Sequence, residues 1–214
     1  MYQPRHFAQD DPAELAALMR AHPLAAIVSQ TDDGLTADHI PLEYDAVNGR
    51  LLGHVARANP LWQRGSGPEG APVLVIFRAE QAYVSPNWYP SKATTHKVVP
   101  TWNYAVVHAH GRLSAVDDAP WLRELLQGLT AHHEASQARP WAMQDAPEDY
   151  LAQMMRAIVG IQIRVERLSG KFKLSQNRDA AGRQGVVDGL RGSAQTGAVS
   201  LAERMQQLSA RADR

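Results

Sequence analysis

Short apolar stretches separated by turn signals run through most of the chain. Alternating or continuous apolar runs of this length predict strands, and they fall at residues 24–30, 35–44, 50–57, 73–77, 82–85, within 101–116 and at 159–168. Thr31-Asp32-Asp33-Gly34 and Asn48-Gly49 are hairpin signals between the first three strands. Pro41 cannot donate a ladder hydrogen bond, so the second strand is expected at a sheet edge or at a bulge.

Helical signals are fewer and are spread over the whole chain. A first helix is expected to begin after Asp11, with Pro12 in its first turn, and to end before Pro23. Further helices are expected after Asn59-Pro60, from Pro120, from about residue 147 and around residues 199–208. Many short strands with a few helices predict a mainly β, α+β fold with flanking helices, and not a doubly wound parallel sheet.

Composition excludes several classes of function. Without cysteine the chain forms no disulfide, iron–sulfur cluster, thiolate zinc site or cysteine nucleophile. Its 22 basic and 22 acidic side chains give a formal net charge of zero, whereas a protein that neutralises many DNA phosphates usually carries a basic excess. No secretory signal is evident and no apolar run approaches the roughly 20 residues of a membrane helix, so we expect a cytoplasmic protein without membrane contact.

The segment from Gly53 to Pro60 ends one expected strand and opens a short helix. A phosphate would find an arginine, Arg57, together with exposed backbone N–H groups and a helix N-terminus. Asn59 is expected to cap the helix and is also able to donate from its side chain. The competing interpretation is a surface arginine beside an asparagine cap.

Two segments, residues 83–89 and 99–104, are dense in aromatic and small polar side chains, although only 7% of the chain is aromatic. A flat heteroaromatic ligand needs apolar faces with a few polar groups at its rim, and these segments offer both. An aromatic core with satisfied hydroxyl and indole groups is the alternative.

Residues 171–178 alternate basic and apolar side chains and then turn polar. Lys171 and Lys173 would share one face of a strand. There they either contact a phosphate or flavin or lie at a solvated sheet edge, where charged side chains prevent pairing with another strand.

The histidines are weaker signals. His108 and His110 share a strand face, and His132-His133 lies late on a helix, but a metal ion needs a further ligand. We therefore predict no metal site.

Taken together, these segments resemble one family, the FMN-binding negative transcriptional regulators known as PaiB-like proteins. The matching segments cover most of the chain in order, and they are MYQPRHF at residues 1–7, HIPL at 39–42, GHVARANP at 53–60, YVSPNWY at 83–89, VPTWNY at 99–104 and KLSQNR at 173–178.

The resemblance implies an FMN-binding split β-barrel, like that of pyridoxamine-phosphate oxidases and flavin reductases, over residues 1–184. Residues 185–214 would form a helical tail packed on the same domain. The chain would form a homodimer with each flavin at the subunit interface. Pairing of two barrels also agrees with the open edges that a split barrel leaves.

The resemblance also implies which residues bind FMN. The strand along the isoalloxazine ring would contribute His39, Ile40 and Pro41. The ribityl chain and phosphate would be surrounded by His54, Ala56, Arg57 and Asn59. The other wall of the ring would be built by Ser85, Trp88, Tyr89, Thr101, Trp102 and Asn103. Candidates from the second subunit are Lys171, Lys173 and Gln176.

Three functions are open at this level. The family implies negative regulation of genes for proteases and sporulation in bacteria, directly or indirectly. Direct DNA binding has weak support from a net charge of zero. A flavin oxidoreductase that moves electrons between a nicotinamide and an unknown small substrate is the alternative. Haem binding or breakdown ranks third, with His108 or His39 as an iron ligand.

Overall fold

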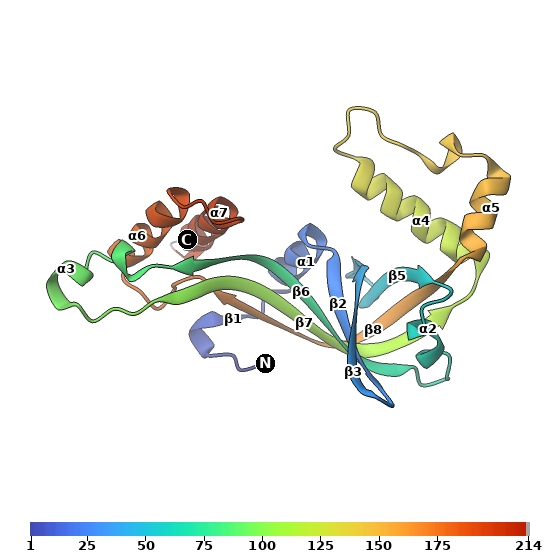
Figure 1. Ribbon diagram of the computed structural model, residues 1–214, viewed down its shortest axis with the longest axis horizontal. Helices are drawn as coiled ribbons and strands as arrows, with labels where there is room; N and C mark the ends of the chain where they lie inside the picture. The colour runs from blue at the N-terminus through green and yellow to red at the C-terminus, as the bar shows by residue number, and fades with distance from the viewer. Residues whose placement is uncertain (213–214) are drawn as a thin grey trace. The chain divides into compact units, whose positions relative to one another are not determined.

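The computed structural model describes residues 1–212, which form two compact units (Figure 1). We call them the terminal unit, which contains Met1–Leu18, Arg78–Val107 and the chain from Ser169 onward, and the central unit, which contains Met19–Phe77 and His108–Leu168. Three long strands, β6 (Ala71–Val84), β7 (Thr101–Val116) and β8 (Ile158–Lys173), contribute residues to both units.

Short antiparallel strands build most of the central unit. The hairpin of β2 (Leu24–Thr31) and β3 (Gly34–Pro41) pairs over its full length, and β2 continues the sheet onto β6 at residues 73–76. A second hairpin joins β4 (Glu43–Asp45) to β5 (Arg50–Ala56), which pairs with β8 from Arg50↔Arg164 to Ala56↔Ile158.

The strand order is β3-β2-β6-β7-β8-β5-β4, with β1 (Ala8–Gln9) also on β8. β3 is therefore an edge strand and Pro41 is its last residue, which confirms the prediction for that proline. The positive φ angles of Gly34 (111°) and Gly49 (63°) explain why both hairpin turns carry glycine. The mainly β fold with flanking helices is confirmed.

The central unit adds the helices α2 (Leu61–Arg64), α4 (Ala119–Glu134) and α5 (Glu148–Arg156), and the 3-10 turn η3 (Met143–Asp145). Asp118 caps α4, because its Oδ1 accepts a hydrogen bond from the backbone N–H of Trp121 at 2.8 Å. Apolar strand residues form the core of the unit, and among those that are fully buried are Ile27, Leu51, Phe77, Leu113, Ile161 and Ile163.

The terminal unit is built on the ends of the long strands. It includes η1 (Arg5–Phe7), η2 (Pro86–Trp88), α3 (Lys92–Thr95), α6 (Ala180–Arg191) and α7 (Ala198–Ala212). α6 and α7 lie side by side (Figure 1) and bury Val186, Leu190 and Leu201. α1 (Pro12–Ala21), whose residues from Met19 onward belong to the central unit, begins at the predicted proline, with the N–H of Ala13 donating to Asp11 Oδ1 at 2.9 Å.

Three expectations about the strands were wrong. The strand expected at residues 35–44 is divided after Pro41 into β3, which pairs with β2, and β4, which pairs with β5. Residues 73–77 and 82–85 are one strand, β6, because the alternation of exposed and buried side chains continues through Arg78 and Ala79. The strand expected at 159–168 extends to Lys173, where β1 pairs with it at Ala8↔Lys171. Residue 185, the expected start of the tail, lies inside α6, and the division into domains stays a prediction.

Candidate functional site

Arg57 follows β5 and is held by four hydrogen bonds within the central unit. Its Nη1 and Nη2 donate to the two carboxylate oxygens of Asp117 at 2.8 and 2.7 Å. Nε and Nη2 also donate to the backbone carbonyls of Arg156 and Ile158 at 2.8 and 3.0 Å. Four of its five N–H groups are therefore engaged, and one remains for a ligand.

The Arg57–Asp117 pair also changes the acidity of both groups. The hydrogen bonds raise the pKa of the guanidinium and lower the pKa of the carboxyl, so both groups stay charged at neutral pH. Asp117 thus neutralises the positive charge of Arg57, which was expected to bind a phosphate. The phosphate contact of Arg57 stays a prediction.

Asn59 connects the start of α2 to the edge strand. The N-cap of α2 is Pro60, which has no side-chain capping bond, so the cap expected at Asn59 was wrong by one residue. Asn59 Oδ1 accepts from the N–H of Leu61 at 2.8 Å, and its Nδ2 donates to Asp38 Oδ1 at 2.8 Å. Asp38 precedes His39 on β3. The bond to Asp38 places residues 57–60 beside the strand that contains His39, Ile40 and Pro41.

The other expected residues of the central unit lie on these two strands. His39 and Pro41 are on the exposed face of β3, while Ile40 is buried on the opposite face. Ala56 is exposed at the end of β5, and His54 is half-buried two residues earlier. His54 Nδ1 is buried without a hydrogen-bond partner among the described residues, and burial lowers the pKa of this imidazole.

Three histidines give the central unit a predicted sensitivity to acid. Burial lowers the pKa values of His54, His108 and His110 below the ordinary 6.5, with positive charge on neighbouring groups adding to the effect at the last two. The unfolded chain therefore takes up protons first as the pH falls. The free energy of unfolding should be highest above about pH 6.5 and should decrease below it, by at most about 1.4 kcal/mol per pH unit for each histidine.

Urea denaturation at about pH 7.5 and about pH 5.5 measures this loss. The variant His54→Gln should lose less stability between the two pH values than the wild type does. Equal stability of the wild type at both pH values would contradict the expectation.

The terminal unit contains a pocket of about 150 Å³, which we call the basic pocket. Its lining consists of apolar, hydroxyl, amide and cationic side chains, and the residues are Phe7, Tyr89, Val99, Pro100, Thr101, Asn103, Lys173, Ser175, Asn177 and Arg178. Four residues from the sequence prediction come together here: Tyr89, Thr101, Asn103 and Lys173.

Two cations define the charge of the basic pocket. Lys173 Nζ donates to Thr101 Oγ1 and to the carbonyl of Trp102, and burial, followed by repulsion from Lys171 and Arg178, lowers the pKa of its ammonium group. The Arg178 guanidinium lies over the ring of Tyr89, with Cζ 4.8 Å from the ring centroid. Among the residues that the structure describes, no aspartate or glutamate lines the pocket.

The polar floor of the basic pocket is buried. Asn103 has no exposed surface, and its Nδ2 donates to Ser175 Oγ at 2.9 Å and approaches Met205 Sδ at 3.5 Å. Ser175 has a positive φ of 63°, which is uncommon for a residue other than glycine. Tyr89 Oη is buried and has no hydrogen-bond partner among the described residues.

The remaining expected residues lie elsewhere in the terminal unit. Trp102 is 52% exposed and stacks edge-to-face on Tyr83 at 6.1 Å between centroids. Lys171 Nζ lies 5.6 and 5.5 Å from the ring centroids of Tyr2 and Tyr104. Gln176 closes a turn, because its Oε1 accepts from the N–H of Leu174 at 2.7 Å and its Nε2 donates to Phe172 O.

Ser85 caps η2 and Trp88 is its last residue, and η2 packs against α6. Ser85 Oγ accepts from the N–H of Asn87 at 3.2 Å. A Cβ built on Gly189 would lie 2.2 Å from Trp88 Cδ2, and one on Gly185 would lie 2.1 Å from Trp88 O. The glycines of α6 therefore let η2 approach the helix backbone and fix the position of Trp88 and Tyr89.

The polar residues of the basic pocket that were not expected from the sequence are Ser175, Asn177 and Arg178. They belong to the segment that resembles the family, so the motif itself was the available signal. The three glycines on one side of α6 were also not expected to form a close contact. The spacing of Gly182, Gly185 and Gly189 places all three on one side of a helix, which is the pattern that could have indicated a close contact.

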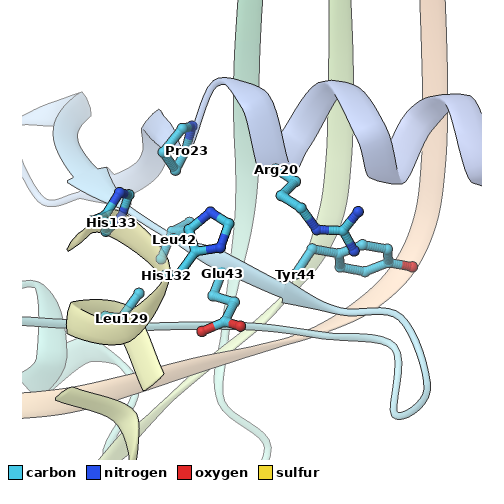
Figure 2. Close-up of a pocket in the computed structure, with 8 residues that line it drawn as sticks. All are labelled: Arg20, Pro23, Leu42, Glu43, Tyr44, Leu129, His132 and His133. Atoms are coloured by element: carbon cyan, nitrogen blue, oxygen red, sulfur yellow. The ribbon is translucent and has the colours of Figure 1, made fainter. Parts of the chain in front are cut away.

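A second pocket of about 60 Å³ lies in the central unit (Figure 2). Arg20 comes from α1, Glu43 and Tyr44 from β4, and His132 and His133 from α4. This second pocket contains none of the residues expected to bind flavin. Among the described residues, no group of three or more His, Cys, Asp or Glu side chains is placed to hold a metal ion.

Solved structures share this fold. The FAD and haem binding protein of Mycobacterium smegmatis matches with a TM-score of 0.57 and 18% identity, over 83% of this chain and 78% of that one. The flavocytochrome Anf3 of Azotobacter vinelandii matches with a TM-score of 0.54 and 16% identity, over 80% and 72%. The fold is thus that of the flavin-binding split barrels.

Residues 1–167 match the family model described as "Putative FMN-binding domain", and the chain belongs to this family. The protease synthase and sporulation protein PAI 2 of Bacillus subtilis is 29% identical over 96% of this chain and 97% of its own length. A protein of unknown function from Aspergillus fumigatus is 32% identical over 82% and 85%. The family therefore extends to fungi and is not confined to bacteria.

The residues present fit an FMN cofactor. FMN needs donors for its phosphate and polar groups at the rim of its ring, with apolar surface against the ring faces. The terminal unit offers Lys173, Arg178 and the unpartnered Tyr89 Oη, with the exposed ring of Trp102 as apolar surface.

Among the described residues, no helix is both long and apolar enough to cross a membrane.

Proposed function

We propose that the protein is a cytoplasmic FMN-binding regulator that lowers gene expression indirectly, through its flavin-bound state. The observation that supports it is the match of nearly the whole chain to the PAI 2 protein, whose name ties it to protease synthesis and sporulation. The formal net charge of zero disfavours direct clamping of DNA. A signal carried by the cofactor to a partner protein needs no basic surface.

In this proposal two copies of the chain hold each FMN between them. Residues 39–41 and 54–59 of the central unit contact the ring and the phosphate tail, and the segments with Trp88, Tyr89 and Trp102 supply the other wall. Lys171, Lys173 and Gln176 come from the second copy. FMN, when bound, supplies the capacity to accept and release electrons. The protein's side chains bind the cofactor, orient it and exclude water.

The Arg57–Asp117 pair offers a test of the phosphate contact. The variant Asp117→Asn removes the charge that neutralises Arg57, so it should tighten FMN binding severalfold relative to riboflavin, which has no phosphate. Arg57→Ala should weaken FMN binding about tenfold and leave riboflavin binding nearly unchanged, because a charge-assisted hydrogen bond is lost. Quenching of flavin fluorescence measures both affinities.

The matched control is Arg164→Gln, which removes an exposed arginine of the same unit that is paired with Glu166. It should leave both affinities unchanged. An unaltered preference for FMN over riboflavin in both Arg57→Ala and Asp117→Asn would remove Arg57 from the site.

Retardation of promoter DNA separates indirect from direct regulation. The FMN-loaded protein should give no sequence-dependent retardation. Salt-sensitive and sequence-dependent retardation would assign direct repression and contradict the indirect route.

A further inference from the structure

The basic pocket of the terminal unit carries unbalanced positive charge. Lys173 and Arg178 both line it, and no acidic side chain of residues 1–212 does. Within residues 1–212, the Arg178 guanidinium has no ion pair and donates no hydrogen bond, and it is held only over the ring of Tyr89. An arginine that stacks on an aromatic ring and has no acidic partner keeps its paired N–H groups available for an oxyanion.

Lys173 is similarly placed to donate. Its ammonium group has three N–H donors, and two of them go to Thr101 Oγ1 and the carbonyl of Trp102. Both acceptors are neutral, so they leave the charge of Lys173 uncompensated. The third N–H remains for a ligand in the pocket.

An independent observation points to a ligand in the same place. Tyr89 is only 3% exposed, it lines the pocket, and its Oη has no partner among the described residues. Buried hydroxyl groups are almost always hydrogen-bonded, because leaving one without a partner costs free energy. A bound oxyanion would accept the hydrogen bond that the protein itself does not provide.

We propose that the basic pocket binds a phosphate group through Lys173, Arg178 and the hydroxyl of Tyr89. A phosphate monoester has three terminal oxygens, which matches donors that approach from several directions better than the two oxygens of a carboxylate do. The volume of about 150 Å³ suits such a group and is below the roughly 300–1,000 Å³ of pockets that enclose whole ligands. The inference does not rest on the proposed function. The group is that of a separate phosphorylated molecule if the phosphate of FMN lies at Arg57, and it is that of FMN if the phosphate lies in this pocket instead.

Calorimetric titration of the full-length protein with inorganic phosphate tests the site. Lys173→Gln and Arg178→Gln should each lower phosphate affinity about tenfold, as expected for loss of a hydrogen bond from a charged donor. Tyr89→Phe should lower it severalfold without loss of folded protein, because the hydroxyl has no structural partner to lose. Lys97→Gln, which removes an exposed lysine of the same unit outside the pocket, is the matched control and should have no effect.

Titrations with FMN and riboflavin then identify the source of the group. If the pocket holds the flavin phosphate, Arg178→Gln lowers the affinity for FMN but not for riboflavin. If it holds a separate ligand, both flavins bind the variant as they bind the wild type, while inorganic phosphate does not. Phosphate affinity that is equal in the wild type, Lys173→Gln and Arg178→Gln would overturn the proposal, whatever the flavin result.

Discussion

Replacing Gly185 by alanine is expected to lower the free energy of unfolding by about 2–3 kcal/mol. The new Cβ would lie 2.1 Å from the backbone oxygen of Trp88. A backbone atom cannot rotate away as a side chain can, so α6 and η2 must separate. Because Tyr89 directly follows Trp88 at the end of η2, the separation should also disturb the basic pocket. Urea denaturation measures the loss of stability.

Gly128→Ala is the matched control, because it makes the same change in the helix α4, where nothing lies within 4 Å of the added Cβ. It should raise the free energy of unfolding by about 0.5–1 kcal/mol, since alanine loses less backbone entropy than glycine in a helix. If both variants gained stability equally, the close packing of α6 on η2 would be wrong.

Replacing Asn103 by alanine is expected to lower the free energy of unfolding by about 3 kcal/mol. The side chain has no exposed surface and connects β7 to Ser175, in the turn after β8, and to Met205 of α7. Its removal leaves a small cavity and a buried Ser175 hydroxyl without its partner. Thermal and urea denaturation should agree on the size of the loss.

The double variant Asn103→Ala, Ser175→Ala separates the hydrogen bond from the lost volume. It removes both partners, so no buried hydroxyl is left unsatisfied, and it should lose less than the sum of the two single variants. Strict additivity would contradict the interaction between the two side chains.

Local chemistry made much of the central unit predictable. Gly34 and Gly49 occupy turn positions with positive φ, so the sequence indicates both hairpins. Asn59 closes the turn before α2 through a bond that spans two residues. Each of these features depends on neighbours in the sequence, which is the range over which patterns of residues are informative.

The rest depends on contacts between distant residues. Asp117 lies 60 residues from Arg57, and nothing near either residue indicates that they pair. The basic pocket combines Phe7, Tyr89 and Lys173 from three separate parts of the chain. α6 has three glycines, which disfavour a helix, and its stability comes from packing on η2 and α7. Patterns of neighbouring residues therefore do not indicate this helix.

The flavin content of the purified, full-length protein tests the central claim most directly. Native mass spectrometry together with an absorbance spectrum identifies the cofactor and the number of chains in one preparation, and the spectrum would also reveal haem. We predict a species with two chains and two FMN molecules. A colourless single chain that takes up no FMN when the cofactor is added would contradict the account.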